Sequence, residues 1–256
     1  MILVKKIIFR IVRGNFSRYL SIKYGIFLLA DKCQLYEAVE MRVLKKLLKQ
    51  GDLVIDGGAN FGIYSKRMAK LVGEKGLVLS FEPLPFLCDF MRKNINQKNI
   101  KIIPKALSAE NRKLILFIPY IGKGLLEPAL ASLEQFAIPA LEQIVECVKL
   151  DDHTDKDRKV SFIKIDLEGH EMQALLGGQR ILQEDRPIVQ FEENNIKEKE
   201  GQWTSFSIVN NYQIFTIRTK LKKSKMNYYL VPNEKVNDFI KILGRSFHVN
   251  AIRSSN

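Results

Sequence analysis

Residues 53–62 of this chain read Leu53-Val-Ile-Asp56-Gly57-Gly58-Ala59-Asn60-Phe61-Gly62, and this stretch decides the fold. It begins as a short apolar strand that ends in a carboxylate, and small residues then turn the chain into a helix. Glycine lets the backbone approach a ligand closely, and the first turn of a helix offers unpaired amide groups. A strand, a tight turn and a helix in this order are typical of a nucleotide-type binding corner in an open α/β sheet.

Strands and helices alternate on both sides of this corner. Further strands are expected at Leu77–Glu82, Ile100–Pro104, Val160–Asp166 and Pro187–Glu193, with amphipathic helices between them. Such alternation predicts a mostly parallel, doubly wound α/β sheet with helices on both faces. Two late strands around the basic segment 220–225 are expected to close the sheet as an antiparallel pair.

The domain organisation follows from composition and charge. With 256 residues, 46% of them hydrophobic, the chain can form one domain with a full core, and we assign that domain to residues 36–256. Residues 119–144 interrupt the alternation with glycines and prolines, which predicts an insertion on the substrate side. Three scattered cysteines favour a reducing, cytoplasmic setting.

Residues 1–35 form a basic amphipathic segment. No acidic residue precedes Asp31, whereas six basic residues do, and the whole chain has a net charge of +13. The segment contains no run of about 18 apolar residues, the length that a membrane span requires. Two interpretations stay open: residues 1–30 lie on an anionic membrane, at its inner face, or the segment packs against the domain or a second subunit.

The glycine corner and a second carboxylate predict the cofactor. The corner lacks the GxGxxG spacing that aims helix amides at a pyrophosphate. S-adenosylmethionine (SAM) has no phosphate, and Asp56 with the backbone of Gly57 and Gly58 could bind its ammonium and carboxylate. Glu82, at the end of the next strand, suits two ribose hydroxyls because a carboxylate accepts two hydrogen bonds. The alternative is a tight turn with a helix N-cap.

A cluster of acids follows the strand at residues 160–166. Alternation places Lys164 and Asp166 on one face of that strand, and Glu168 and Glu171 follow at the start of a helix. Carboxylates at the carboxyl edge of a sheet can cap the helix, bind a cation or take a proton from a hydroxyl. Helix capping alone explains all three acids poorly.

Six strings in the sequence resemble the FkbM-type SAM-dependent methyltransferases. They are VIDGGANFG, SFEP, ASL (residues 131–133), KLDDH, FIKIDLEGHE and IVQFEEN, and they occur in order between about Tyr36 and Glu193. The resemblance implies the Rossmann-like sheet of class I methyltransferases and O-methylation of sugar or metabolite hydroxyls. It also implies a SAM site formed by the corner and the next strand end, with these residues: Asp56, Gly57, Gly58, Ala59, Asn60, Gly62 and Glu82.

The expected function is therefore O-methylation of a hydroxyl on a glycan, a glycolipid or a small molecule. Asp166 is expected nearest the reacting hydroxyl, with Lys164 or Glu168 orienting it and Glu171 beside them. The resemblance gives no role to His170, whose position the family fills with various residues. The sequence leaves open a divalent cation held by Asp166 with Glu192 or Glu193.

Two other functions were weighed. The basic charge favours a nucleic-acid methyltransferase, but the position after the strand reads Asp166-Leu-Glu-Gly instead of the Asp/Asn-Pro-Pro-aromatic string of base amino methylation. Methylation of base C5 atoms usually needs a Pro-Cys dipeptide, but no proline comes directly before any of the three cysteines. Closely spaced acids would also repel phosphates, so nucleic acid is not the expected partner. The second alternative is a catalytically silent SAM-fold scaffold at a membrane.

Overall fold

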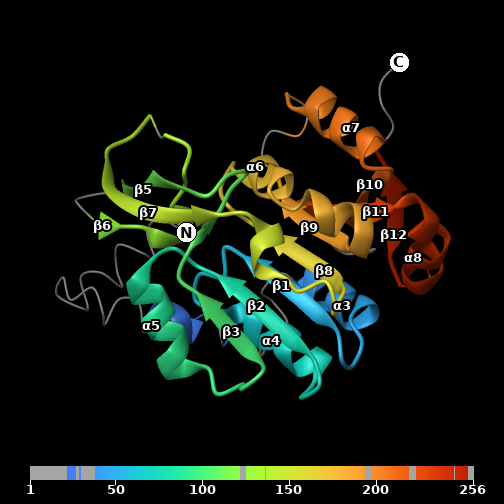
Figure 1. Ribbon diagram of the computed structural model, residues 1–256, viewed down its shortest axis with the longest axis horizontal. Helices are drawn as coiled ribbons and strands as arrows, with labels where there is room; N and C mark the ends of the chain where they lie inside the picture. The colour runs from blue at the N-terminus through green and yellow to red at the C-terminus, as the bar shows by residue number, and fades with distance from the viewer. Residues whose placement is uncertain are drawn as a thin grey trace.

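The computed structural model describes residues 22–26, 29, 38–121, 125–135, 137–193, 196, 198–218, 223–244 and 246–252. Its centre is an eight-stranded sheet with the order β12-β10-β11-β9-β8-β1-β2-β3 (Figure 1). Five neighbouring strands are parallel: β1 (Leu53–Gly57), β2 (Leu77–Phe81), β3 (Ile100–Ile103), β8 (Val160–Ile165) and β9 (Ile188–Glu192). The chain leaves β1 toward β2 and β3 and later returns on its other side with β8 and β9. The order in which strands are added therefore reverses beside β1, and ligands bind at this position in folds of this kind.

The other edge of the sheet is antiparallel, and the predicted fold class is confirmed. β10 (Tyr212–Arg218) and β11 (Lys223–Pro232) are the expected late pair, with β11 paired to β9. A third strand, β12 (His248–Ala251), adds to β10 and was not predicted. It is short and largely exposed, so it has little buried apolar surface to mark it in the sequence.

Alternate residues of the central strands face two different helical layers. Val54, Val78 and Phe162 pack against one layer, whereas Ile55, Leu79 and Ile163 pack against the other. The first layer contains α3 (Ala38–Leu47), α4 (Ile63–Val72) and α5 (Pro85–Asn94), with α8 (Val236–Leu243) beside the antiparallel edge. The second contains α6 (Glu171–Leu176), the π-helical turn η3 (Ile181–Asp185) and α7 (Glu200–Val209). Two apolar faces on each central strand explain why these strands read as continuous hydrophobic runs.

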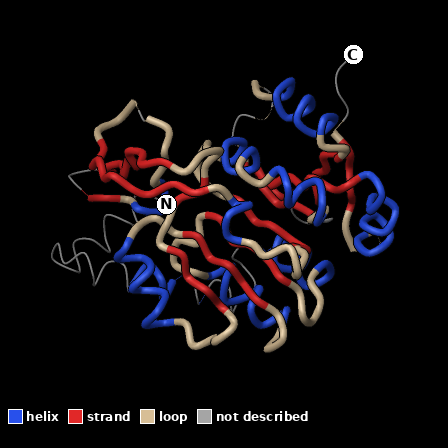
Figure 2. Tube along the Cα trace, in the orientation of Figure 1, coloured by secondary structure: helices blue, strands red, loops and turns tan. Residues whose placement is uncertain are grey.

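A second, four-stranded sheet has the order β4-β7-β5-β6 and lies beside the central one (Figure 2). Its strands are β4 (Ala106–Leu107), β5 (Arg112–Ile121), β6 (Leu125–Leu126) and β7 (Ala140–Val148). β5 and β7 therefore take up both ends of the segment predicted as an insertion. The first part of β7 is mostly exposed, so its sequence lacks the apolar pattern of a buried strand. The short 3-10 turn η1 (Pro128–Leu130) lies between β6 and β7.

Part of the basic N-terminal segment packs against the domain. Residues 22–26 are helical, and the Tyr24 ring lies edge-on to Phe90 with 4.8 Å between ring centroids. Lys23 forms a buried ion pair with Glu127, immediately before η1. This contact agrees with the second of the two interpretations for residues 22–26, whereas residues 1–21 lie outside the described residues. No helix in the described part of the chain is long and apolar enough to cross a membrane.

Candidate active site

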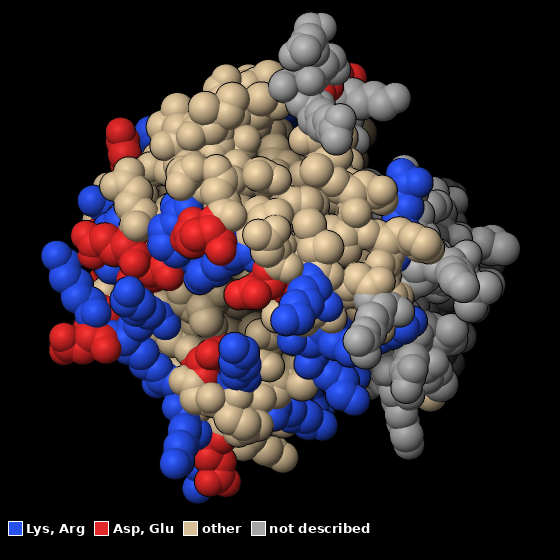
Figure 3. Space-filling model, turned by 90° about the vertical axis from the view of Figure 1, so that its right-hand side faces the viewer, with Lys and Arg blue, Asp and Glu red and all other residues tan. Residues whose placement is uncertain are grey.

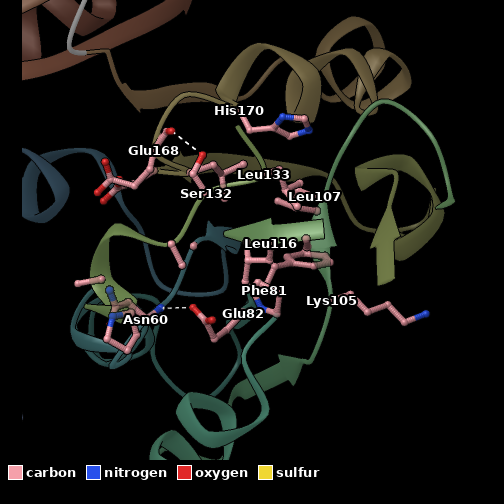
Figure 4. Close-up of a pocket in the computed structure, with 18 residues that line it drawn as sticks. Asn60, Phe81, Glu82, Lys105, Leu107, Leu116, Ser132, Leu133, Glu168 and His170 are labelled. Atoms are coloured by element: carbon pink, nitrogen blue, oxygen red, sulfur yellow. Dashed lines mark hydrogen bonds between the residues drawn. The ribbon is translucent and has the colours of Figure 1, made fainter. Parts of the chain in front are cut away.

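A pocket lies at the carboxyl edge of the parallel strands (Figure 4). Gly58 and Asn60 line it after β1, Glu82 after β2, and Asp166 and Glu168 after β8. Leu116 of β5 and part of the segment between β6 and β7, including Ser132 and Leu133, also line it. Three of the seven residues predicted for SAM and two of the four predicted for catalysis therefore reach one cavity.

The glycine corner is held against β2 by its own amides. Gly58 N–H and Ala59 N–H both donate to the Phe81 carbonyl, at 3.0 and 2.9 Å, and Asn60 N–H donates to Glu82 Oε2 at 2.8 Å. The sequence predicted that backbone groups at the corner would bind the carboxylate of SAM, but these amides bind the protein itself. Gly58 has a φ of 75°, and a Cβ built there would lie 2.0 Å from the Asp166 carbonyl oxygen. The glycine is thus required by the packing of the corner on the loop after β8.

Glu82 is the carboxylate best placed for a ligand hydroxyl. It lines the pocket while its oxygens accept from Asn60 N–H and Leu84 N–H, at 2.8 and 3.0 Å. Each carboxylate oxygen has a second lone pair, so two further hydrogen bonds can be accepted. Burial raises the pKa of Glu82 to about 7. The buried Asn60 Oδ1 beside it has no hydrogen-bond partner within the described residues.

The remaining corner residues stand behind the pocket and are not part of its lining. Gly62 begins α4 with a φ of 75°, and a Cβ there would meet Ile95 Cδ1 at 2.4 Å. Gly57 is the last residue of β1, and Ala59 packs with Met91 and Ile95. These positions shape the corner through packing.

Asp56 belongs to a row of polar side chains that crosses four parallel strands. The register aligns Ser80, Asp56, Lys164 and Gln190 on neighbouring strands, and all four are buried. Ser65 Oγ donates to Asp56 Oδ2 at 2.5 Å, and Lys164 Nζ lies 3.7 Å from Asp56 Oδ1. Lys164 Nζ also donates to the Gly58 carbonyl at 3.3 Å and lies 3.3 Å from Asp166 Oδ2. Lys164 thereby connects the glycine corner to the acid loop.

The acids after β8 differ in their surroundings. Glu171 accepts from Leu167 N–H and Gly169 N–H, so its carboxylate closes the loop at the start of α6. Glu168 has a φ of 52°, a left-handed conformation that is costly for a residue with a side chain. Burial, together with the charges of Asp166 and Glu171, raises the pKa of Glu168 to about 7.

The loop between η1 and β7 binds the acid loop at two points. Ser132 Oγ donates to the Glu168 carbonyl at 2.8 Å, as Figure 4 shows, and Ser132 is itself bridged to Phe117 of β5. Glu134 Oε1 lies 2.7 Å from His170 Nδ1, and Ser108 Oγ lies 3.1 Å from His170 Nε2. His170 lines the pocket but both of its ring nitrogens have protein partners. The part of the chain predicted as a substrate-side insertion therefore reaches the acid loop directly.

One of the acids predicted as metal ligands does not reach the pocket. Glu193 is buried and accepts from Trp203 Nε1 and Lys199 Nζ, each at 3.1 Å, away from the pocket lining. Across the residues that the structure describes, no group of three or more His, Cys, Asp or Glu side chains could hold a metal ion. The suggested set of Asp166 with Glu192 or Glu193 therefore has no support.

The sequence did not identify the wall formed after β3. Lys105, Ala106 and Leu107 line the pocket, together with Phe81 and Leu116. These residues are mostly apolar and come from β2, β5 and the segment after β3, so no local sequence pattern predicts that they meet. Ser132 and Leu133, which also line the pocket, belong to the ASL string, and that string was the only sequence feature that pointed to this part of the pocket.

The sequence model of the Methyltransferase FkbM domain matches residues 56–230. A crystal structure of methyltransferase FkbM from Methylobacillus flagellatus is 16% identical, with a TM-score of 0.49 over 70% of this chain and 43% of that chain. A SAM-dependent methyltransferase from Aquifex aeolicus is 18% identical, with a TM-score of 0.45 over 81% of this chain and 95% of that chain. A putative rRNA methylase from Clostridium thermocellum is 13% identical, with a TM-score of 0.46 over 84% and 95%. No curated protein matches.

The chain belongs to the FkbM family of SAM-dependent methyltransferases. Its pocket fits SAM on two observations. Glu82 keeps two acceptor positions toward the cavity beside the orphaned Asn60 Oδ1, and the wall at Phe81, Ala106 and Leu107 offers an apolar surface to a flat ring.

Proposed function

We propose that this protein transfers the methyl group of SAM to a hydroxyl of a glycan or a glycolipid. The observation that supports this most is the shared pocket, in which Asp166 and Glu168 line the same cavity as Gly58 and Glu82. An alcohol is a poor nucleophile at neutral pH because it keeps its proton. A carboxylate beside the cofactor can accept that proton, whereas a more acidic acceptor would not need such help. Small-molecule hydroxyls fit the same chemistry.

The chain supplies binding, alignment and a proton acceptor. SAM, when bound, provides an electrophilic methyl group: the acceptor oxygen bonds to the methyl carbon, sulfur keeps the electrons of the broken bond, and the hydroxyl proton goes to a base. Glu82 would bind the ribose hydroxyls, and Asn60 would bind next to it. Holding the two reactants in line can supply much of the acceleration. Lys164 fixes the distance between the glycine corner and Asp166.

The test is transfer of isotope-labelled methyl groups from SAM into fractions of cells that lack this gene. Polysaccharide, lipid, RNA and protein fractions are incubated separately with the purified chain. Label in the polysaccharide or lipid fraction, released as a methyl ether of a sugar, supports the proposal. Label confined to the RNA fraction would overturn it in favour of the nucleic-acid methyltransferase that the net charge of +13 suggests. SAM binding with no labelled fraction would favour the silent scaffold.

A further inference from the structure

The two acids that line the pocket differ in how far their oxygens are already engaged. Asp166 Oδ2 lies 3.3 Å from the ammonium of Lys164, which is buried and also bound to Asp56 and to the Gly58 carbonyl. The Glu168 carboxylate, by contrast, makes no hydrogen bond or ion pair with any part of the chain that the structure describes; its only bond in the loop is through its backbone carbonyl. One pocket acid is therefore held in a charged cluster, and the other lines the cavity with a carboxylate that has no partner among the described residues.

We propose that Glu168, and not Asp166, takes the proton of the acceptor hydroxyl, while Lys164 holds Asp166 as a fixed negative charge beside it. This assignment rests on the proposed function. The hydroxyl proton passes to a Glu168 oxygen as the hydroxyl oxygen forms its bond to the methyl carbon and the carbon–sulfur electrons remain on sulfur. Glu168 then returns the proton to water, because its side chain is only partly buried.

The backbone keeps Glu168 in place from both sides. Its left-handed φ of 52° costs free energy that the rest of the loop must offset. Ser132 Oγ holds the Glu168 carbonyl on one side, and Glu171 holds the amides of Leu167 and Gly169 on the other. A strained residue fixed by hydrogen bonds from two separate elements is the arrangement expected of a side chain that must point in one direction.

The charges around Glu168 also favour a proton acceptor that works near neutral pH. Glu171 and Asp166 face it from its own loop, Glu127 from the start of η1 and Lys164 from β8, so three acids outnumber one ammonium. His170 and Glu82 line the same pocket. Burial and these acids raise the pKa of Glu168 to about 7, the range in which a general base is most effective.

The test uses four variants, labelled SAM and the cell fraction that accepts label from the wild type. We expect the wild-type rate to rise with pH through about 7 and then level off, because only ionised Glu168 accepts a proton. Glu168→Gln should lose about 10²–10⁴-fold in rate and lose that rise, with its SAM affinity by calorimetry unchanged. Glu168→Asp should keep the rise, and the exposed control Glu142→Gln should behave as wild type.

Asp166→Asn separates the two acids. Because the charge of Asp166 raises the pKa of Glu168, Asp166→Asn should keep the rise with pH but move it to lower pH. A Glu168→Gln variant with more than a tenth of the wild-type rate, or with the wild-type pH profile, overturns the assignment. So does an Asp166→Asn variant that alone loses the rise. A wild type that binds SAM and labels no fraction overturns the proposed function and this role together, whereas an active wild type with an active Glu168→Gln overturns this role alone.

Discussion

Gly58 shows how one residue determines the geometry of the site. Its φ of 75° and the 2.0 Å between a built Cβ and the Asp166 carbonyl oxygen make two separate demands for glycine. Any side chain at this position pushes the acid loop away from β1 before it can touch a ligand. The first contact of a side chain at residue 58 therefore lies within the protein.

Gly58→Ala is therefore expected to destabilise the fold, and Gly51→Ala is the matched control. Gly51 has a φ of 89° but nothing within 4 Å of a built Cβ, so its substitution costs only backbone strain, about 1 kcal/mol. Gly58→Ala should lower the free energy of unfolding by at least about 2 kcal/mol more, because the clash adds to the strain. Urea denaturation measures both. Equal losses in the two variants would mean that the corner can move away from the acid loop.

Glu168 should make stability depend on pH in a defined direction. Its pKa is about 7 in the folded chain and near the ordinary 4.5 in the unfolded chain. Between these values the folded state keeps a proton that the unfolded state has lost, so the contribution of Glu168 to stability falls as pH rises from about 4.5 to 7. Glu168→Gln removes this loss.

The Glu168→Gln variant should match the wild type at pH 4.5 and exceed its free energy of unfolding at pH 8 by about 1–3 kcal/mol. The measurement is urea denaturation at the two pH values. A difference between the two proteins that is the same at both pH values would show that the Glu168 carboxyl is not perturbed by its surroundings. Gained stability with lost turnover is the combination expected of a catalytic residue in a costly environment.

At the scale of elements, the helical residues 22–26 stabilise the loop that lines the pocket. Lys23 pairs with Glu127, whose side chain is fully buried immediately before η1. Breaking a buried ion pair from one side leaves an uncompensated charge and costs about 3–5 kcal/mol. Lys23→Met should lose stability on this scale, and Lys23→Met combined with Glu127→Gln should recover part of it. Chemical denaturation of both variants checks this, and a Lys23→Met variant as stable as the wild type would contradict the pairing.

The elements that the sequence predicted are those whose burial in the fold matches a pattern of apolar residues in the sequence. Four of the five parallel strands were predictable because they are buried on both faces, the exception being the edge strand β3. The corner at residues 56–62 was predictable because its turn needs small residues. β12 and the first half of β7 were not, since both are largely exposed and bury few apolar side chains. Within the site, the structure brings Gly58, Asn60, Glu82, Asp166 and Glu168 to one pocket. The use of the corner amides by Phe81 and Glu82, and the bond between Ser132 and Glu168, depend on tertiary contacts that no local pattern contains.

At the scale of the whole molecule, the positive charge is spread unevenly. The face in Figure 3 carries Lys and Arg side chains mixed with acids over its lower half and few charges over its upper half. The sequence adds five basic and no acidic residues within residues 1–21. Attraction of such a segment to anionic lipid falls with salt as the charges are screened.

Removal of residues 1–21 should therefore abolish binding to anionic phospholipid vesicles at low salt and leave SAM affinity intact. The deletion ends before Ile22 because residues 22–26 pack against the domain. Vesicle sedimentation at rising salt measures the effect, with neutral vesicles as the control. An intact chain that ignores anionic vesicles at low salt would exclude membrane contact through this segment.

The placement of SAM at the carboxyl edge of β1 and β2 is tested most directly by calorimetric titration of the wild type and of Glu82→Ala with SAM. Lost ribose hydrogen bonds should cost about 1–3 kcal/mol, which weakens binding by about 5–150-fold, whereas the exposed control Glu74→Ala should bind as the wild type does. Thermal melting confirms that Glu82→Ala is folded, because Glu82 also accepts from Asn60 and Leu84. We expect single-site binding that is weakened only in Glu82→Ala. Equal SAM affinity in the wild type and a folded Glu82→Ala would contradict the site.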